Sequence, residues 1–188
     1  MSSFETILYD KLDGIGYVTI NRPEFLNAYN IRMRDELFEI LGAVKDDPDV
    51  KAVIFRGAGD KAFCAGADLS EFLTAPPPVA ARKVRFDRDV WGLFLSLPQP
   101  LIAALHGYVL GSGIEIALCC DIRLVSDDVK FGLPEVGLGI IPAAGGTQTL
   151  PRIIGRAKTL EMFLTGKRLT AKEALDCRLA NCIYSRRD

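Results

Sequence analysis

Short apolar runs alternate along the chain with longer stretches in which apolar residues recur at helical spacing. Residues 16–21 alternate between apolar and polar side chains, and residues 52–55, 102–105 and 122–125 are short apolar runs. Alternation with period two is typical of half-buried β-strands, and short apolar runs are typical of buried ones. We therefore predict strands in these four segments and a closing strand within residues 179–184.

The region after Asn30 predicts a helix. Asn is a favourable N-cap residue, and Asp47-Pro48 provides a stop signal because proline cannot continue a helix. Between them, five apolar residues recur at helical spacing: Met33, Leu37, Ile40, Leu41 and Val44. The pattern indicates an amphipathic helix with one face in the core.

Further helices are predicted downstream. Val79, Val84, Trp91 and Leu95 trace one face of a second helix, which we expect to pack in the core. Short helices are predicted over residues 114–120, 158–164 and 171–177. Because strands and helices alternate, the chain is predicted to be an α/β protein, with a single domain over residues 1–188.

Composition excludes several classes of protein. The 188 residues include 23 basic and 24 acidic side chains and 49% hydrophobic residues, and no run of like charges suggests a nucleic-acid surface. The N-terminus lacks the pattern of a signal peptide, and no apolar run is long enough to span a membrane. Five cysteines without C-x-x-C spacing fit a reducing compartment, so a cytoplasmic protein with no membrane or nucleic-acid partner is expected.

His106 is the only histidine. A metal site rich in histidine is therefore excluded, and a Ser-His-Asp triad would depend on this one residue. His106 follows an apolar run and precedes a glycine, so we interpret it as a structural histidine bonded to the main chain. The cysteines, including Cys64 in a Gly/Ala-rich loop, are interpreted as small core residues.

Two glutamates, Glu115 and Glu135, lie in stretches so rich in aliphatic residues and glycine that a charged side chain is unexpected there. Burial and a second nearby carboxylate both disfavour ionisation, so a buried pair tends to separate into an acid and a base. Structural alternatives remain open at this point: ion pairs with Arg123 or Arg152, or a solvent-exposed Glu135.

The turn Gly111-Ser112-Gly113 opens the apolar segment that contains Glu115. Main-chain N–H groups at a helix start have no acceptor within the helix, so this turn could supply an oxyanion donor. The loop of small residues around Ala67 could supply a second one. Two such N–H groups aimed at one carbonyl oxygen would stabilise an enolate.

Taken together and in order, five motifs resemble the crotonase, or enoyl-CoA hydratase/isomerase, superfamily. The resemblance covers nearly the whole chain. The motifs are Asn21-Arg-Pro-Glu-Phe-Leu-Asn-Ala28, Ala62-Phe-Cys-Ala-Gly-Ala-Asp-Leu69, the segment from His106 to Ala117, Cys120-Asp-Ile-Arg123 and the segment from Phe131 to Gln148.

The resemblance implies a ββα-spiral fold that binds an acyl-CoA thioester. It assigns the oxyanion hole to the N–H groups of Ala67 and Ser112, proton exchange at the α-carbon to Glu135, and activation of the attacking water to Glu115. It also assigns contacts with the acyl-CoA to Ala28, Ala65, Ala67, Asp68, Leu69, Ser70 and Ser112, with Ala65 near the adenine. Neither a metal nor a redox cofactor is expected, because coenzyme A enters as part of the substrate, and the family pattern implies a homotrimer or hexamer.

Two features depart from the family pattern. Ser112 stands where many members have glycine, although a serine N–H can still donate if its dihedral angles permit. The chain stops at Asp188, so the usual C-terminal helical trimerisation region is expected to be absent. Exposed apolar surface and an open active site are then expected.

The retention of both glutamates favours an enoyl-CoA hydratase, which reversibly adds water to a trans-2-enoyl-CoA to give a 3-hydroxyacyl-CoA. The alternatives are an enoyl-CoA isomerase or a hydratase of a cyclic or branched acyl-CoA. A non-catalytic acyl-CoA-binding or scaffold protein is the alternative from another class.

Overall fold

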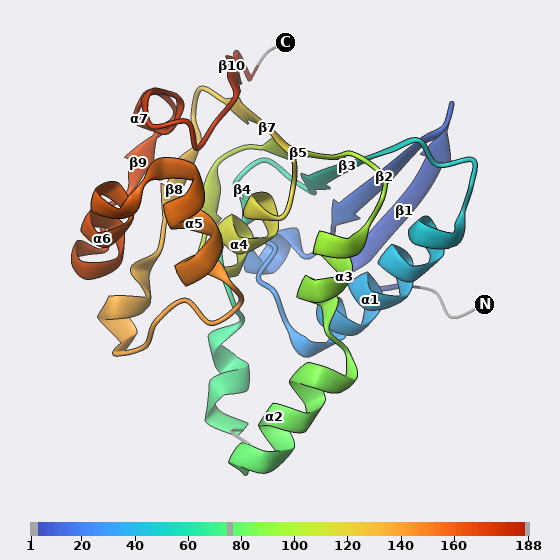
Figure 1. Cartoon of the computed structure of the whole chain (residues 1–188), viewed down its shortest axis with the longest axis horizontal. Coiled ribbons are helices and arrows are strands. Elements are labelled where there is room, and N and C mark those ends of the chain that lie inside the picture. Colours follow the sequence, from blue (N-terminus) through green and yellow to red (C-terminus); the bar gives the residue numbers. More distant parts are fainter. Residues whose placement is uncertain (1–3, 75–76, 187–188) are drawn as a thin grey trace.

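The structure is a computed structural model that describes residues 4–74 and 77–186 (Figure 1). The strands are β1 Ile7–Leu12, β2 Ile15–Ile20, β3 Ala52–Gly57, β4 Ala62–Cys64, β5 Leu101–Leu105, β6 Tyr108–Leu110, β7 Ile122–Ser126, β8 Lys130–Gly132, β9 Leu169–Thr170 and β10 Cys182–Tyr184. The α-helices are α1 Ile31–Asp46, α2 Pro78–Asp87, α3 Val90–Ser96, α4 Ser112–Leu118, α5 Gly146–Ile154, α6 Arg156–Thr165 and α7 Ala171–Asp176. Short 3-10 helices are η1 Pro23–Phe25, η2 Leu69–Thr74 and η3 Pro134–Leu138.

The strands form two sheets between which the chain alternates. The larger sheet has the order β1-β2-β3-β5-β7-β10, and the smaller has the order β4-β6-β8-β9. All pairings are parallel except β1 with β2 and β8 with β9. Each of β3, β5 and β7 in the larger sheet is followed by a strand of the smaller sheet, so successive turns of the chain stack as a spiral. The α/β prediction is confirmed.

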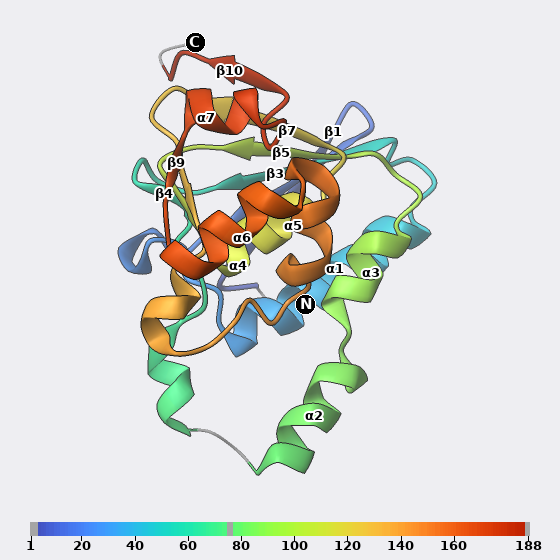
Figure 2. The ribbon, with the colours of Figure 1, turned by 60° about the vertical axis from the view of Figure 1, so that its left-hand side comes forward.

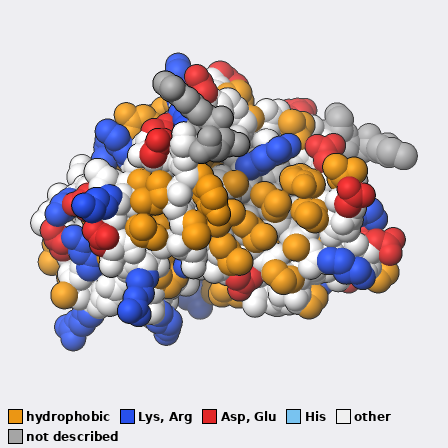
Figure 3. Space-filling model, turned by 90° about the horizontal axis from the view of Figure 1, so that it is seen from above, with side chains coloured by type: hydrophobic (Ala, Val, Ile, Leu, Met, Phe, Trp, Pro, Cys, Tyr) orange, Lys and Arg blue, Asp and Glu red, His pale blue; other side chains and the backbone are white. Residues whose placement is uncertain are grey.

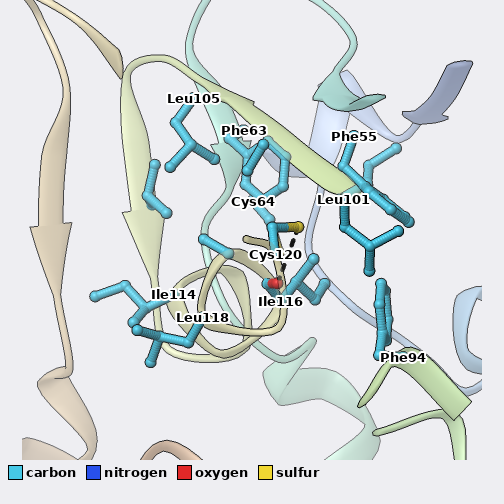
Figure 4. Packing of buried hydrophobic residues seen from close by; sticks show 14 of the residues in the cluster. Phe55, Phe63, Cys64, Phe94, Leu101, Leu105, Ile114, Ile116, Leu118 and Cys120 are labelled. Carbon is cyan, nitrogen blue, oxygen red and sulfur yellow. Dashed lines mark hydrogen bonds between the residues drawn. The ribbon is translucent and has the colours of Figure 1, made fainter. Parts of the chain in front are cut away.

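The core lies between the two sheets and around α4 (Figure 4). All residues of α4 from Gly113 to Leu118 are buried, as expected for a helix whose residues in this range are apolar except for Glu115. Phe55 of β3 packs on Phe94 of α3, with ring centroids 5.1 Å apart. The Cys120 thiol donates to the carbonyl oxygen of Ile116 at 3.6 Å, so it occupies the core as a small side chain.

Several predicted elements are confirmed. The Asn30 side chain caps α1 by accepting the Met33 N–H at 2.8 Å, and the five predicted apolar residues of this helix are buried. The predicted strands correspond to β2, β3, β5, β7 and β10. The segment 102–105 was predicted to be buried throughout, but Ile102 and Ala104 are only half-buried, because they lie on the opposite face of β5 from Ala103 and Leu105.

The prediction of a single core helix over Val79–Leu95 is wrong. The segment forms α2 and α3, and Asp89 begins the second helix by accepting the Gly92 N–H. Val79 is 82% exposed and Leu95 is 66% exposed, so neither packs in the core, and the Val84 side chain lies outside the described part. Only Trp91 is half-buried against the core. Figures 1 and 2 show α2 projecting from the body of the molecule.

Sequence patterns did not indicate β1, α5 or the strands of the smaller sheet. Most of β1 is exposed because it forms an edge, and the strands of the smaller sheet are only two or three residues long. Periodicity cannot be recognised over so few residues. Within the described ranges, no helix is both long enough and apolar enough to cross a membrane.

Candidate functional site

A cleft of about 420 Å³ opens between η2, α3, α4 and η3. It collects most of the residues singled out from the sequence: Ala65, Ala67, Asp68, Leu69, Ser112, Glu115 and Glu135. Ala28 and Ser70 do not line it. The Ala28 carbonyl accepts a hydrogen bond from Arg22, and the exposed Ser70 donates its hydroxyl to Asp68 Oδ1 at 2.7 Å, so each contacts one member of the Arg22–Asp68 ion pair.

Two glycines bring distant parts of the chain together at the floor of the cleft. Gly66 and Gly111 both have positive φ angles, of 107° and 49°. A Cβ added to Gly111 would lie 3.4 Å from the Gly66 Cα and 3.3 Å from Glu135 Oε1. The two main-chain turns therefore pack directly against each other, which places the following residues, Ala67 and Ser112, side by side.

Main-chain hydrogen bonds formed by the residues on either side of Ala67 direct its N–H group towards the cleft. The Tyr29 N–H donates to the Gly66 carbonyl and the Asp68 N–H donates to the Tyr29 carbonyl, both at 2.8 Å. In such a parallel bridge, the N–H of the intervening residue points away from the paired segment. Since Ala67 also lines the cleft, its N–H is directed there.

The N–H group of Ser112 is the first of α4 and has no acceptor within the helix. The position of α4 is fixed by Gly113, because a Cβ there would lie only 2.3 Å from the Cys64 carbonyl oxygen. The helix thus approaches β4 more closely than any side chain would permit. The result is two main-chain donors, from Ala67 and Ser112, at one wall of the cleft.

Glu115 projects from α4 and is 3% exposed. Its Oε1 accepts the N–H groups of Ala144 and Gly146, each at 2.8 Å. A Cβ on Gly146 would lie 3.0 Å from this oxygen, so the loop before α5 lies close over the carboxylate. Two main-chain donors hold Glu115 in a defined orientation at the cleft.

Glu135 reaches the same cleft from η3. Its Oε2 is buried and has no hydrogen-bond partner among the described residues. Burial, and secondarily the nearby charge of Glu115, raise the pKa of Glu135. A carboxyl group in this setting retains its proton at higher pH than an ordinary glutamate and has an oxygen free for another molecule.

The structural alternatives for these glutamates find no support. Arg123 donates to the carbonyl oxygens of Leu179 and Cys120, and Arg152 donates to that of Gln148. Glu135 forms no ion pair in the described part of the chain. The expected paired carboxylates therefore share one cleft.

His106 lies outside the cleft lining. Its ring bonds to the main chain of Gly59, and burial followed by the charge of Arg186 lowers its pKa. The prediction of a structural histidine is confirmed. Burial also raises the pKa of the Cys64 thiol to about 11, which fits a core residue rather than a nucleophile.

Sequence reasoning missed the residues that support the cleft. Arg22 forms an ion pair with Asp68 at 3.0 Å and donates to the Ala28 carbonyl. Asn27 is fully buried and donates to the carbonyl oxygens of Ala58 and Ala62. A buried amide with two main-chain partners fixes the loop around it, but such a role depends on residues distant in the sequence.

An aromatic wall closes one side of the cleft. The rings of Tyr29 and Trp91, which both line it, have centroids 5.8 Å apart, and Trp91 stacks on Phe94 at 6.2 Å. Leu138, Ile140 and Ile141 also line the cleft, and all three are exposed. Among the residues with described positions, no three His, Cys, Asp or Glu side chains are grouped so that they could hold a metal ion.

Residues 10–188 match the family model described as enoyl-CoA hydratase/isomerase. YngF of Bacillus subtilis, named as an enoyl-CoA hydratase/isomerase, is 43% identical over 90% of this chain and 66% of its own length. The short-chain-enoyl-CoA hydratase of Clostridium acetobutylicum is 42% identical over 93% of this chain and 67% of its own length. The chain thus spans about two thirds of the length of these relatives.

Solved structures share the fold. The crystal structure of the enoyl-CoA hydratase from Bacillus anthracis superposes with a TM-score of 0.89 at 37% identity, covering 96% of this chain and 70% of that one. The spiral predicted for the single domain is therefore confirmed.

Proposed function

Because the chain belongs to the enoyl-CoA hydratase/isomerase family, we propose that it is an enoyl-CoA hydratase that reversibly converts a trans-2-enoyl-CoA to a 3-hydroxyacyl-CoA. One observation carries the proposal: two carboxylates, Glu115 and Glu135, face one cleft beside two main-chain N–H groups. Hydration needs both a base for water and an acid for carbon, and this site offers one of each.

The thioester carbonyl would accept hydrogen bonds from the N–H groups of Ala67 and Ser112. Addition of water to the β-carbon moves electron density onto the carbonyl oxygen and forms an enolate. Donors fixed by packed main chain need no reorganisation as this charge develops, so they stabilise the transition state more than the substrate. The contact between Gly66 and Gly111 is what sets their spacing.

Glu115 would act as the base. It removes a proton from the bound water, whose oxygen forms a bond to the β-carbon. The N–H groups of Ala144 and Gly146 hold its Oε1, so the orientation of this carboxylate at the cleft is fixed. Glu135, whose raised pKa favours the protonated form, then delivers a proton to the α-carbon and the enolate collapses to the thioester.

The acyl-CoA itself would lie along Ala65, Asp68 and Leu69, while Ala28 and Ser70 form hydrogen bonds with Arg22 and Asp68 next to them. No step of this reaction requires a metal or redox cofactor. Assembly into trimers or hexamers and a cytoplasmic location stay predictions.

A second candidate activity is isomerisation of an enoyl-CoA. Hydration of a cyclic or branched acyl-CoA is a further alternative, which differs from the proposed hydration only in its substrate. The unpartnered oxygen of Glu135 favours isomerisation, because a single carboxylate can remove a proton from one carbon and return it to another. A non-catalytic acyl-CoA-binding protein is the third possibility.

The test measures loss of the enoyl-thioester absorbance of crotonyl-CoA by wild type, Glu115→Gln and Glu135→Gln. Glutamine preserves size but cannot exchange a proton, so each substitution should lower kcat by about 10²- to 10⁴-fold. Glu161→Gln on the surface of α6, where Glu161 forms ion pairs with Lys158 and Lys167, is the matched control and should leave the rate unchanged.

Product analysis separates the alternatives. A shifted double bond without added water, obtained with a longer enoyl-CoA and dependent on Glu135 alone, would replace hydration with isomerisation. Binding of the thioester without turnover by wild type would identify a binding protein instead.

A further inference from the structure

In the described part of the chain, two basic residues line the cleft: Arg34 of α1, and Arg88 between α2 and α3. Lys and Arg side chains are ordinarily found where water solvates them. On the surface seen from above in Figure 3, they lie mostly near the outline, while hydrophobic side chains gather in the middle. Two arginines in the wall of one cleft are therefore candidates for contact with a ligand.

The two arginines approach the same part of the cleft from different elements. α3 packs beside α1, so the residues just before α3 come close to the start of α1 (Figures 1 and 2). Arg34 Nη2 lies 2.7 Å from Asp35 Oδ1, and Arg88 Nη1 lies 3.4 Å from the same oxygen. One carboxylate oxygen thus holds two positive charges near each other.

This arrangement leaves hydrogen-bond donors on both guanidinium groups. Asp35 accepts from Nε and Nη2 of Arg34, and no described residue accepts from its Nη1. Arg88 lies 3.4 Å from Asp35 and 3.8 Å from Glu39, beyond the usual hydrogen-bond range of about 2.7–3.2 Å. Since neither Asp35 nor Glu39 lines the cleft, a ligand in the cleft can reach the donors that remain.

The acidic residues that line the cleft already have other roles. Asp68 forms its ion pair with Arg22, and Glu71 accepts the first main-chain N–H of α1 with both oxygens, each at 3.1 Å. Glu115 and Glu135 are the carboxyl groups assigned to the reaction. None of the four forms an ion pair with Arg34 or Arg88 in the described structure, so the positive charge of the two arginines is not cancelled from within the cleft.

The arginines lie on the aromatic side of the cleft. Ala67, which carries one main-chain donor, forms a bridge with Tyr29, and the Tyr29 ring contacts Trp91. Arg34 lies in the first turn of α1, just after Tyr29, and Arg88 precedes Trp91 by three residues. Most of the residues assigned to coenzyme A lie instead between β4 and η2. The arginines are therefore placed to meet the acyl part of the substrate.

We propose that Arg34 and Arg88 bind a carboxylate at the far end of the acyl chain, so that the substrate is a trans-2-enoyl-CoA derived from a dicarboxylic acid. The inference rests on the proposed hydratase function and names its substrate class. Guanidinium groups form strong charge-assisted hydrogen bonds with carboxylates and are less strongly hydrated than ammonium groups. Ile31, Phe72 and Val90 also line the cleft and would contact the methylene groups of the acyl chain.

Equilibrium binding of two saturated ligands, adipyl-CoA and hexanoyl-CoA, tests the proposal without depending on turnover. The ligands share the coenzyme A part and the length of the acyl chain, and they differ in the terminal carboxylate. Wild type should bind adipyl-CoA at least about 10-fold more tightly than hexanoyl-CoA. Arg34→Met and Arg88→Met, which keep an unbranched side chain without its charge, should each lower this preference by about 10-fold or more.

Arg156→Met, at an exposed position on α6, is the matched control and should leave the preference unchanged. Circular dichroism checks that each variant is folded. Equal binding of the two ligands by wild type overturns the proposal, and so does an unchanged preference in both cleft variants. Variants that weaken both ligands equally also overturn it, because the arginines would then bind the phosphates of coenzyme A.

Turnover separates this inference from the proposed function. Wild type should hydrate trans-2-hexenedioyl-CoA with a higher kcat/KM than trans-2-hexenoyl-CoA, and both cleft variants should lower the ratio of the two values. A protein that prefers adipyl-CoA through both arginines but hydrates neither enoyl-CoA would refute the hydratase and still support the carboxylate site. A protein that hydrates both at equal kcat/KM and binds both saturated ligands equally would support the hydratase and refute the carboxylate site.

Discussion

Replacement of Gly113 by alanine tests whether close packing of α4 on β4 positions the site. An added Cβ would lie 2.3 Å from the Cys64 carbonyl oxygen and 3.0 Å from the Cys64 Cβ. Carbon–oxygen contacts need roughly 3.3 Å, so the start of α4 must move by about 1 Å. Ser112 and Glu115 lie on this helix and would move with it.

The size of the effect follows from this displacement. Overpacking costs about 1–3 kcal/mol, while alanine in place of glycine gains about 0.5–1 kcal/mol in a helix. A net loss of about 1 kcal/mol lowers the Tm of a chain of this size by about 2–4 °C. A misplacement of about 1 Å in a catalytic group reduces turnover by about 100-fold, so activity should fall far more than stability.

Hydration of crotonyl-CoA and thermal denaturation measure the two effects together. Gly42→Ala is the matched control, because it is also a helical glycine but has no atom within 4 Å of the added Cβ. It should raise the free energy of unfolding slightly and leave kcat unchanged. Wild-type turnover by Gly113→Ala would refute the reasoning, since the helix position would then not determine the geometry of the donors.

Two further predictions concern titratable groups. The folded protein holds the pKa of Glu135 above its ordinary value of 4.5, so ionisation of this side chain disfavours folding at neutral pH. Glu135→Gln should therefore have a higher Tm than wild type near pH 7, with the difference disappearing as the pH falls below about 4.5; an equal difference at both pH values would contradict this assignment. Because burial raises the pKa of Cys64 to about 11 while Cys182 is exposed, iodoacetamide should label Cys182 in the native protein and Cys64 only after unfolding, as mass spectrometry of the peptides can show. Equal labelling rates in the native protein would mean that Cys64 is accessible.

The sequence indicated which residues could carry out the chemistry of the site, but it did not indicate the contacts that hold those residues in place. Glu115 and Glu135 are conspicuous because their neighbours are apolar, and a Gly-Ser-Gly turn before a helix is a local signal for a main-chain donor. The contact between Gly66 and Gly111 is not local, and neither is the ion pair of Arg22 with Asp68. Such contacts depend on strand order, which periodicity does not give.

Local sequence patterns also led to a wrong helix prediction where regular apolar spacing concealed an N-cap residue. Asp89 is a good N-cap residue and could have indicated that the helix over residues 79–95 is interrupted, but the apolar spacing on both sides obscured it. The apolar runs at residues 52–55 and 102–105 correctly predicted strands. They could not show that only one face of the larger sheet is covered, because a run of apolar residues is the same whether its outer face meets a helix or solvent.

The alternation of the chain between the two sheets has a consequence for folding. Gly66 follows β4 and Gly111 follows β6, and these adjacent parallel strands are separated along the chain by η2, α2, α3 and β5. Parallel pairing over such a separation has a large loop-closure cost and forms slowly. The two donors therefore come together only after long-range pairing is complete, and the recovery of activity during refolding would report the final folding step rather than the early formation of helices.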